Sequence, residues 1–289
     1  MSRLWSTCIV AGLLCSSAAF PPAIAAGAVD EEAVSIPNFN PDGETAWAAD
    51  RPASDDFLPH DKAAGPGPVE SDPLHPYVPN GNGRQSTYRV ADLSNPILKP
   101  WAIALMKKAN DDVLAGKVPF IARERCYPIG VPGYEIYNRG QPIHIIQTKD
   151  KVVMINELYA QTRHIYLNVP HTEHPKPSWH GESVGHYEGD TLVVDTIGFN
   201  NKSHIDNYRT PHTTELHVIE RFRMVDGGKT LETNIWVEDP GAFNMPWTAR
   251  STWRRVAAGR LIEDLCEPQV ENWFGYDVVP IPRDDAPAF

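Results

Sequence analysis

The chain has 289 residues, of which 42% are hydrophobic and 22% charged, and a formal net charge of −11. This length is enough for one large domain or two small ones with a substantial core. The excess of acidic residues excludes the basic surface that nucleic-acid binding requires, so no nucleic-acid partner is expected.

The first 26 residues have the pattern of an export signal. Arg3 gives the positively charged start, Leu4–Phe20 is apolar, and Ala23-Ile24-Ala25 is a cleavage pattern whose cut is open by a residue or two. The apolar run is too short to span a membrane. The pattern predicts a periplasmic or secreted protein without a membrane anchor.

Cleavage of this signal removes two of the four cysteines and leaves Cys126 and Cys266. Two cysteines in an exported chain most simply form one disulfide. Two separate buried thiols are the alternative.

Residues 27–82 are rich in Pro, Ala, Asp and Glu and contain few large aliphatic side chains. Such a segment cannot bury enough apolar surface to offset its ordering entropy. It predicts an extended, flexible arm in which Trp47, Phe57 and Tyr77 are isolated anchors, followed by a single domain over residues 83–289.

One helix is expected over residues 95–116. Asn95 can cap it, Pro96 suits a first turn, and Gly116 ends it. Pro100 would move the true start nearer to Lys99. The apolar positions recur at helical spacing, which predicts packing against a sheet.

The rest of the domain alternates short apolar runs with turn residues, which is typical of β-strands. The expected strands are Pro142–Thr148, Lys151–Leu158, Thr162–Asn168, Ser183–Glu188, Thr191–Ile197, Thr214–Val225, Thr230–Glu238, Trp247–Val256 and Leu261–Leu265. Sequential antiparallel strands after a single helix predict a mainly β protein, a lipocalin-like meander barrel.

The longest hairpin permits a register argument. If Val225 faces Thr230, then Phe222 faces Thr233 and Glu220 faces Ile235, which makes one face apolar apart from Glu220. A buried carboxylate needs a reason. Glu220 is therefore either a general acid or base, or half of an ion pair with Arg163 or Arg250.

A second polar group is expected upstream. With Ala160-Gln161 as a turn, Glu157 faces His164 and shares a face with His144 and Tyr166. Glu157, His164 and Tyr166 would then form a base, its orienting partner and a hydroxyl donor. A one-residue slip would instead pair Glu157 with Arg163, and a solvent-facing pair is the structural alternative.

Six of the eleven histidines fall between His174 and His217. The spacings His171-Thr-Glu-His174 and His212-Thr-Thr-Glu215 could hold zinc or copper. No HExxH helix or cysteine ligand pair accompanies them, so no metal and no cofactor is expected. The chain also lacks the G-x-S-x-G, Walker A and dinucleotide motifs.

The long motif that begins W-H-G-E-S-V-G-H-Y-E-G-D-T-L-V-V-D-T resembles a large group of exported, poorly characterised bacterial proteins. The matching segments are Trp179–Asn200, Pro211–Phe222, Asp239-Pro240 and Pro246-Trp247-Thr248. The resemblance implies recurring polar positions at Glu157, Arg163, Glu188, Asp190, Asp195, His212, Glu215, Glu220 and Arg221. Such proteins are common in bacteria that degrade plant or aromatic matter, which implies lignin-derived compounds as one substrate class.

The leading hypothesis is a cofactor-independent lyase or isomerase that uses general acid–base chemistry on a small, partly aromatic molecule in a barrel pocket. The expected catalytic residues are Glu220, Glu157, His164, Tyr166 and His212, and the expected substrate contacts are Arg163, Asp195 and Phe222. Glu220 and His212 are expected to face one cavity. The alternatives are a lipocalin-like carrier and a His-rich metal-binding protein, and association into a homo-oligomer stays open.

Overall fold

The computed structural model describes residues 36–49, 97–118, 120–136, 141–206, 209–257, 261, 264–266 and 277–278. The predicted export signal and the expected anchors Phe57 and Tyr77 lie outside these ranges. The elements in chain order are β1 Thr45–Ala49, α1 Pro100–Leu114, β2 Lys117–Val118, η1 Ala122–Arg125, α2 Gly133–Ile136, β3 Ile143–Gln147, β4 Lys151–Asn156, η2 Leu158–Ala160, β5 Gln161–Leu167, β6 Glu182–Glu188, β7 Thr191–Ile197, β8 His217–Val225, η3 Asp226–Gly228, β9 Thr230–Glu238, β10 Trp247–Ala257 and β11 Asp277–Val278.

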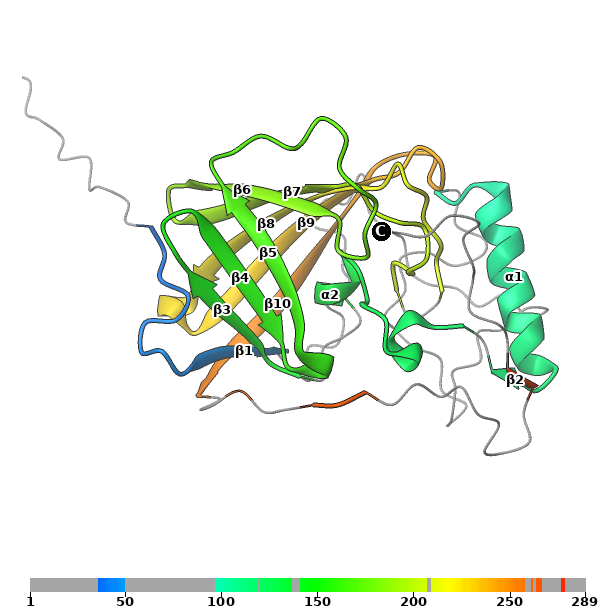
Figure 1. Ribbon diagram of the computed structural model, residues 1–289, viewed down its shortest axis with the longest axis horizontal. Helices are drawn as coiled ribbons and strands as arrows, with labels where there is room; N and C mark the ends of the chain where they lie inside the picture. Colours follow the sequence, from blue (N-terminus) through cyan, green and yellow to red (C-terminus); the bar gives the residue numbers. More distant parts are fainter. Residues whose placement is uncertain are drawn as a thin grey trace, which may run out of the picture. The chain divides into compact units, whose positions relative to one another are not determined.

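Nine strands form a closed barrel, in the order β1-β10-β9-β8-β7-β6-β5-β4-β3 (Figure 1). The predicted barrel with one packing helix is confirmed. Strand β1 closes the ring between β10 and β3, with Trp47 opposite Arg255 on one side and Ile143 on the other. The prediction that residues 27–82 are only an arm is therefore wrong for 45–49, because Trp47 is fully buried inside the wall that this strand completes.

The β8–β9 hairpin has the register that its sequence predicts. Glu220 pairs with Ile235, Phe222 with Thr233 and Val225 with Thr230. Burial alternates along both strands, so Val218, Glu220 and Phe222 point inward. A period of two residues fixes this face because a one-residue slip would expose every apolar side chain of the hairpin.

The predicted pairing of β4 with β5 is wrong. The connection is the 3-10 turn η2, in which Tyr159 adopts a left-handed conformation (φ 55°), and His164 pairs with Val153 rather than with Glu157. Glu157 consequently precedes the turn and has no partner on β5. His164 and Tyr166 point outward from the barrel, whereas Arg163 points inward.

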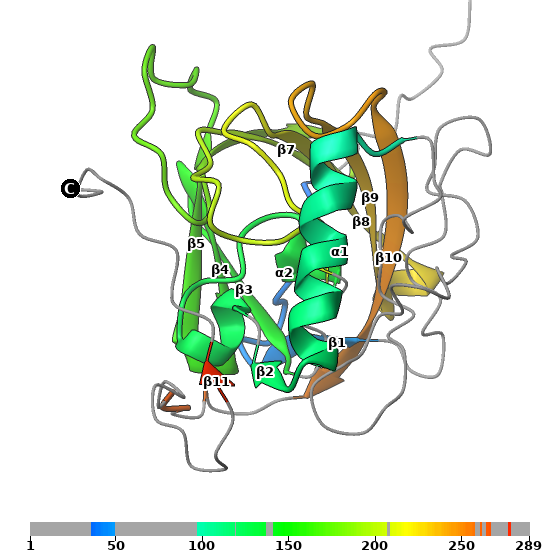
Figure 2. The same ribbon diagram turned by 90° about the vertical axis from the view of Figure 1, so that its right-hand side faces the viewer.

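Strands β5 and β6 are parallel, which departs from the simple meander expected. They are paired only over Ile165–Leu167 and Ser183–Gly185. A parallel neighbour requires a crossover connection. Here it is the long loop 168–181, which projects away from the strands (Figures 1 and 2).

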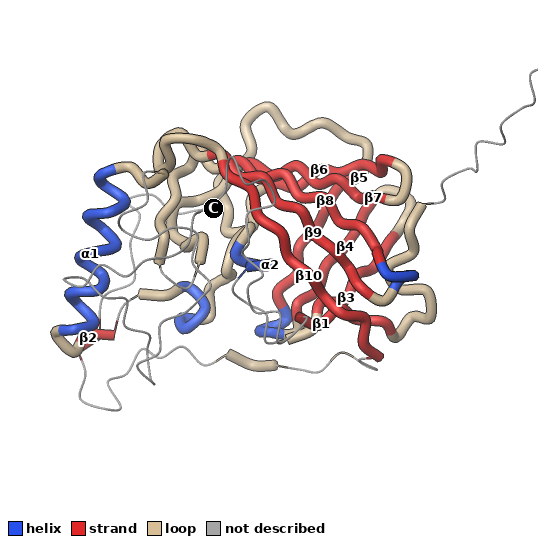
Figure 3. The backbone as a smooth tube through the Cα atoms, turned by 180° about the vertical axis from the view of Figure 1, so that it is seen from behind, coloured by secondary structure: helices blue, strands red, loops and turns tan. Residues whose placement is uncertain are grey.

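Helix α1 begins at Pro100, near the shifted start that the sequence predicts. Its buried side chains Ala102 and Met106 join an apolar cluster with Val218, Ile235 and Trp247 of the barrel. Helix α1 lies at the end of the barrel where α2 is also found (Figure 2). In Figure 3 this end consists of helices and loops, drawn in blue and tan, whereas the barrel itself is drawn in red. A second cluster, with Trp47, Tyr134 and Phe222 among its members, fills another part of the interior.

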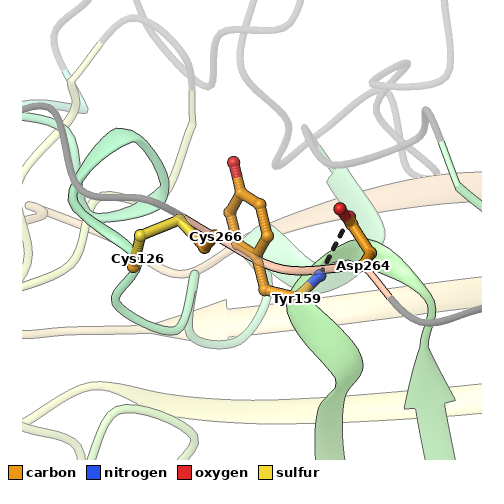
Figure 4. Close-up of a disulfide and its surroundings, with 4 residues drawn as sticks. All are labelled: Cys126, Tyr159, Asp264 and Cys266. Atoms are coloured by element: carbon orange, nitrogen blue, oxygen red, sulfur yellow. Dashed lines mark hydrogen bonds between the residues drawn. A yellow bond between two sulfur atoms is a disulfide. The ribbon is translucent and has the colours of Figure 1, made fainter.

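The predicted disulfide Cys126–Cys266 is present and joins positions 140 residues apart (Figure 4). Beside it, the backbone N–H of Tyr159 donates to Asp264 Oδ2 at 3.2 Å. Both contacts tie the segment after β10 to the body of the protein. A further strand was expected over Leu261–Leu265. Its described residues, 261, 264 and 265, do not belong to a β-strand.

Candidate functional site

A cavity of about 560 Å³ opens beside the first half of β5. The ladder between β5 and β6 covers only Ile165–Leu167 of β5 and does not reach positions 162–164. Side chains from both faces of β5 border the opening there. The lining residues are Thr162, Arg163, His164, Tyr166, Thr172, His174, Pro175, Lys176, His180, Gly181, Glu182 and Ser183. A volume of this size suits a small organic ligand.

Arg163 forms the inner wall of the cavity. Its Nη1 donates to Glu220 Oε1 at 2.9 Å and to Glu135 Oε1 at 3.3 Å, and its Nη2 donates to Thr196 Oγ1 at 2.9 Å and to Glu220 Oε2. Its Nε donates to Ser183 Oγ at 3.2 Å. These contacts use all five N–H groups of the guanidinium. Arg163 is therefore the ion-pair partner of Glu220, and it has no donor left for a substrate.

Two carboxyl groups share this one cation. Glu135 and Glu220 are fully buried, and the bidentate contact assigns the negative charge to Glu220. Burial, and next the charge of Glu220, raise the pKa of Glu135 well above its ordinary 4.5. Both effects favour the protonated form of Glu135 over its carboxylate. Its Oε2 has no hydrogen-bond partner.

His180 stands between this buried layer and the cavity. Burial, and next the charge of Arg163, lower the pKa of His180 to about 4. Its ring packs edge-on against Tyr134 at 5.9 Å, and its buried Nδ1 has no hydrogen-bond partner. The cavity thus holds a neutral imidazole with an unused ring nitrogen.

The outer rim is rich in groups that can exchange or donate protons. His164 and Tyr166 extend from the outward face of β5, and His174 and Lys176 extend from loop 168–181. Lys176 has no ion-pair partner among the described residues. Glu182 is the single lining carboxylate, and Thr172 donates to both of its oxygens, at 2.8 and 2.9 Å.

The expected site residues separate into two groups. Arg163, His164 and Tyr166 line the cavity, and Glu220 holds Arg163 from behind. The others lie elsewhere: Glu157, His212, Asp195 and Phe222. Neither Glu220 nor His212 lines the cavity described above, so the prediction that these two residues share one cavity stays a prediction.

The expected site residues that do not line the cavity make structural contacts elsewhere. Glu157 Oε1 is 2.8 Å from His144 Nε2, a buried pair beneath the start of β3. Phe222 belongs to the apolar core. Asp195 is on the outer wall, where its Oδ1 is 3.1 Å from His171 Nε2 and 2.9 Å from His217 Nε2.

His212 lies in a buried hydrogen-bonded chain in the loop before β8. Its Nε2 is 2.8 Å from Ser203 Oγ, and its Nδ1 is 3.0 Å from the carbonyl oxygen of Thr213. The backbone N–H and the hydroxyl of Thr213 in turn donate to Asp239. These hydrogen bonds attach the loop to the core. Burial lowers the pKa of His212.

The histidine-rich segment does not assemble a metal site in the described part of the chain, where no three His, Cys, Asp or Glu side chains are placed to hold an ion. His171 and His174, the spacing that suggested one, have different environments. His171 contacts Glu182 and Asp195, whereas His174 lines the cavity.

Sequence reasoning missed Glu135, His180, Ser183 and Lys176. Glu135 follows a proline- and glycine-rich stretch without periodicity, so no pattern indicates its burial. His180, Ser183 and Lys176 lie in or next to the segment that joins β5 to β6. The concentration of polar residues there was the available signal.

None of the described helices combines the length and the apolarity that crossing a membrane would require. Comparison of the chain with protein-family models, with curated proteins and with solved structures finds no match in any of the three. The chemistry of the cavity is therefore the basis for a functional proposal.

Proposed function

We propose that the chain is a periplasmic enzyme that transfers a proton on a small, partly aromatic molecule bound in the cavity beside β5. The reaction class is a lyase or an isomerase that needs no cofactor. The observation that carries the proposal is the set of proton-transfer groups gathered on one 560 Å³ cavity, namely His164, Tyr166, His174 and His180. A cleft that contains a titratable group with a perturbed pKa, as His180 has here, is typical of active sites.

His180 is the proposed general base. As a neutral imidazole it has a lone pair available at pH 7, and its low pKa comes from burial and from Arg163. An anionic substrate beside it would oppose the effect of Arg163 and raise that pKa towards neutrality. The imidazole of His180 would then be basic enough to accept a proton when the substrate is bound, as the reaction requires.

The other lining groups bind and orient. Lys176, which has no ion-pair partner among the described residues, would hold a carboxylate or phenolate, and Tyr166 would flank the ring of an aromatic substrate. The Arg163–Glu220 pair fixes Ser183 from behind. Lignin-derived phenolic acids have this combination of one negative charge and one ring.

The test is a search for turnover with a matched histidine control. Purified protein, without added metal or cofactor, is incubated in D₂O with a panel that includes vanillate and ferulate, and products are separated by liquid chromatography and mass spectrometry. An isomerase gives a new retention time at unchanged or deuterated mass, whereas a lyase gives a fragment. His180→Gln should lower turnover by roughly 10²–10⁴-fold, and His186→Gln on the outer face of β6 should not.

A carrier is the second candidate, and one observation favours it. The guanidinium of Arg163 is saturated by side chains of the barrel, so the buried ion pair is complete without a ligand. If panel compounds bind but the wild-type protein neither converts them nor exchanges their protons with D₂O, the enzyme proposal is refuted and the carrier stands.

A further inference from the structure

The cavity beside β5 has a buried serine in its inner wall. Ser183, the second residue of β6, lines the cavity together with Arg163 and is only 2% exposed. In the β6–β7 ladder it is paired with Thr196, which is fully buried and does not line the cavity. The hydroxyl oxygens of Ser183 and Thr196 are 3.0 Å apart. A hydroxyl can donate to a ligand only if its proton is not already used within the protein, so the use of each proton matters.

The guanidinium of Arg163 donates to both of these hydroxyl oxygens. Its Nε donates to Ser183 Oγ at 3.2 Å, and its Nη2 donates to Thr196 Oγ1 at 2.9 Å. A guanidinium contains no acceptor, so neither hydroxyl can give its proton to Arg163. Among the described residues, the remaining hydrogen-bond contact of either hydroxyl is the one between Ser183 and Thr196. That contact uses one of the two protons and leaves the other without an acceptor in the described part of the protein.

Burial decides which hydroxyl keeps the unused proton. If Ser183 donated to Thr196, the O–H of Thr196 would have no acceptor at a fully buried position, and it would carry the full desolvation penalty of an unmade hydrogen bond. If Thr196 donates to Ser183, the unused proton belongs to a residue that borders the cavity, where water or a ligand can accept it. The second arrangement is therefore favoured. Its hydrogen bonds run from Arg163 through Thr196 to Ser183.

This arrangement makes the Ser183 hydroxyl a stronger donor than an isolated serine. Its oxygen accepts two hydrogen bonds, one of them from a charged group, and hydrogen bonds in a chain polarise one another. All five N–H groups of Arg163 are used inside the barrel, so Arg163 acts on a ligand through Ser183 and not by direct contact. A polarised O–H donor favours an acceptor oxygen that carries negative charge.

We propose that the Ser183 hydroxyl is a substrate-binding group that donates a hydrogen bond to an oxyanion of the ligand, either a phenolate or an enolate conjugated to an aromatic ring. No base contacts the Ser183 hydroxyl, which makes it a donor and not a nucleophile. When the substrate gives a proton to His180, the electron pair left behind places negative charge on the oxygen that Ser183 binds. This catalytic role rests on the proposed function, whereas the binding of an oxyanion requires no turnover.

The test is the pKa of a coloured phenol bound in the cavity. The probe is 4-nitrophenol, whose phenol and phenolate forms absorb at different wavelengths, and it is titrated alone and with saturating wild-type protein. All titrations contain 1 M NaCl, which screens the charge of the exposed Lys176 beyond about 3 Å. The pKa of the bound probe should lie about 1–2 units below that of the free probe, the effect of one hydrogen bond to a charged acceptor. Ser183→Ala should remove most of this lowering.

Two further variants provide the controls. Ser251→Ala removes the hydroxyl of another buried barrel serine, which donates to the carbonyl oxygen of Glu135 at 3.4 Å and does not line the cavity. The pKa of the bound probe should be the same in this variant as in the wild type. Lys176→Gln removes the ammonium group of an exposed residue and should keep the lowered pKa. This second variant still decides between the ammonium and a neutral donor if circular dichroism shows that Ser183→Ala does not fold.

Four results would overturn the proposal. They are a wild-type protein that does not bind millimolar 4-nitrophenol, a bound probe whose pKa is not lowered, equal pKa values in the wild type and folded Ser183→Ala, and loss of the lowering in Lys176→Gln or Ser251→Ala. Absence of turnover in the substrate panel would refute the enzyme proposal and leave the role of Ser183 in binding intact.

Discussion

Replacing Glu220 by glutamine tests whether the buried layer carries one negative charge or two. The change preserves shape but removes the counter-charge of Arg163, whose side chain is 1% exposed. Breaking a buried ion pair in this way costs about 3–5 kcal/mol when nothing replaces the lost charge. Glu135, 3.3 Å from Arg163 Nη1, is the group that could replace it.

The structure predicts a partial replacement. The charge of Glu220 is, after burial, the main cause of the raised pKa of Glu135. Without Glu220, Arg163 should draw the proton off Glu135, and the cost should fall to about 2–4 kcal/mol, since one weaker contact substitutes for a bidentate pair. For a domain of this size that is a fall in Tm of roughly 4–16 °C.

The matched control is Glu135→Gln, which removes a neutral acid. It should cost no more than about 1 kcal/mol, the value of one ordinary hydrogen bond. The double variant leaves Arg163 without any counter-charge, so it should cost more than the sum of the two single changes. Urea unfolding of the oxidised protein gives all three free energies, and the infrared band of a protonated carboxylic acid should be absent from Glu220→Gln.

Equal destabilisation by the two single variants would show that both carboxylates are ionised in the folded protein. Additive effects would show that Glu135 does not take over the charge. Either result would refute the prediction that Glu135 is protonated in the folded protein, although not the position of Arg163 in the barrel.

Three further changes have expected outcomes. The disulfide Cys126–Cys266 closes a loop of 140 residues, so its reduction should lower the unfolding free energy by about 4–5 kcal/mol in the chain-entropy model. Mass spectrometry that finds two free thiols in periplasm-derived protein would contradict the pairing. The hydrogen bond with Asp195 raises the pKa of His217 above 6.5, so the contribution of this pair to stability should be complete below pH 6.5 and disappear as the pH rises through the folded pKa. His217→Gln should remove that part of the pH dependence of the unfolding free energy. An unchanged pH profile in this variant would disprove the coupling. Purified protein should contain no stoichiometric transition metal, and elemental analysis that finds about one zinc or copper per chain, with activity lost to a chelator, would revive the metal-binding interpretation.

Local patterns in the sequence were sufficient for much of this fold. The β8–β9 register follows from a short turn and from strict alternation, because neighbouring residues on a strand must face opposite sides. The same argument placed Glu220 inside the barrel and named Arg163 as one of two partners. The pairing of Cys126 with Cys266 followed from the expectation that an export signal is cleaved and leaves these two cysteines.

The tertiary structure decided everything that depends on which distant segments meet. Strand β1 has only five residues and lies in a segment rich in Pro, Ala, Asp and Glu, and only the closing of the ring makes Trp47 a core residue. The turn η2 contains a left-handed Tyr159, which no local preference indicates, and it moved Glu157 away from His164. Such a turn changes the register of the two strands that it joins.

The cavity arises in the same way. It exists because β6 runs parallel to β5 and pairs with only its last residues, which leaves an opening that loop 168–181 then covers. The charge states within it are also collective, since burial and the charge of Glu220, which reaches Arg163 with two oxygens, together raise the pKa of Glu135. A sequence specifies which side chains can carry charge, but the folded arrangement of neighbours and burial decides which of them does.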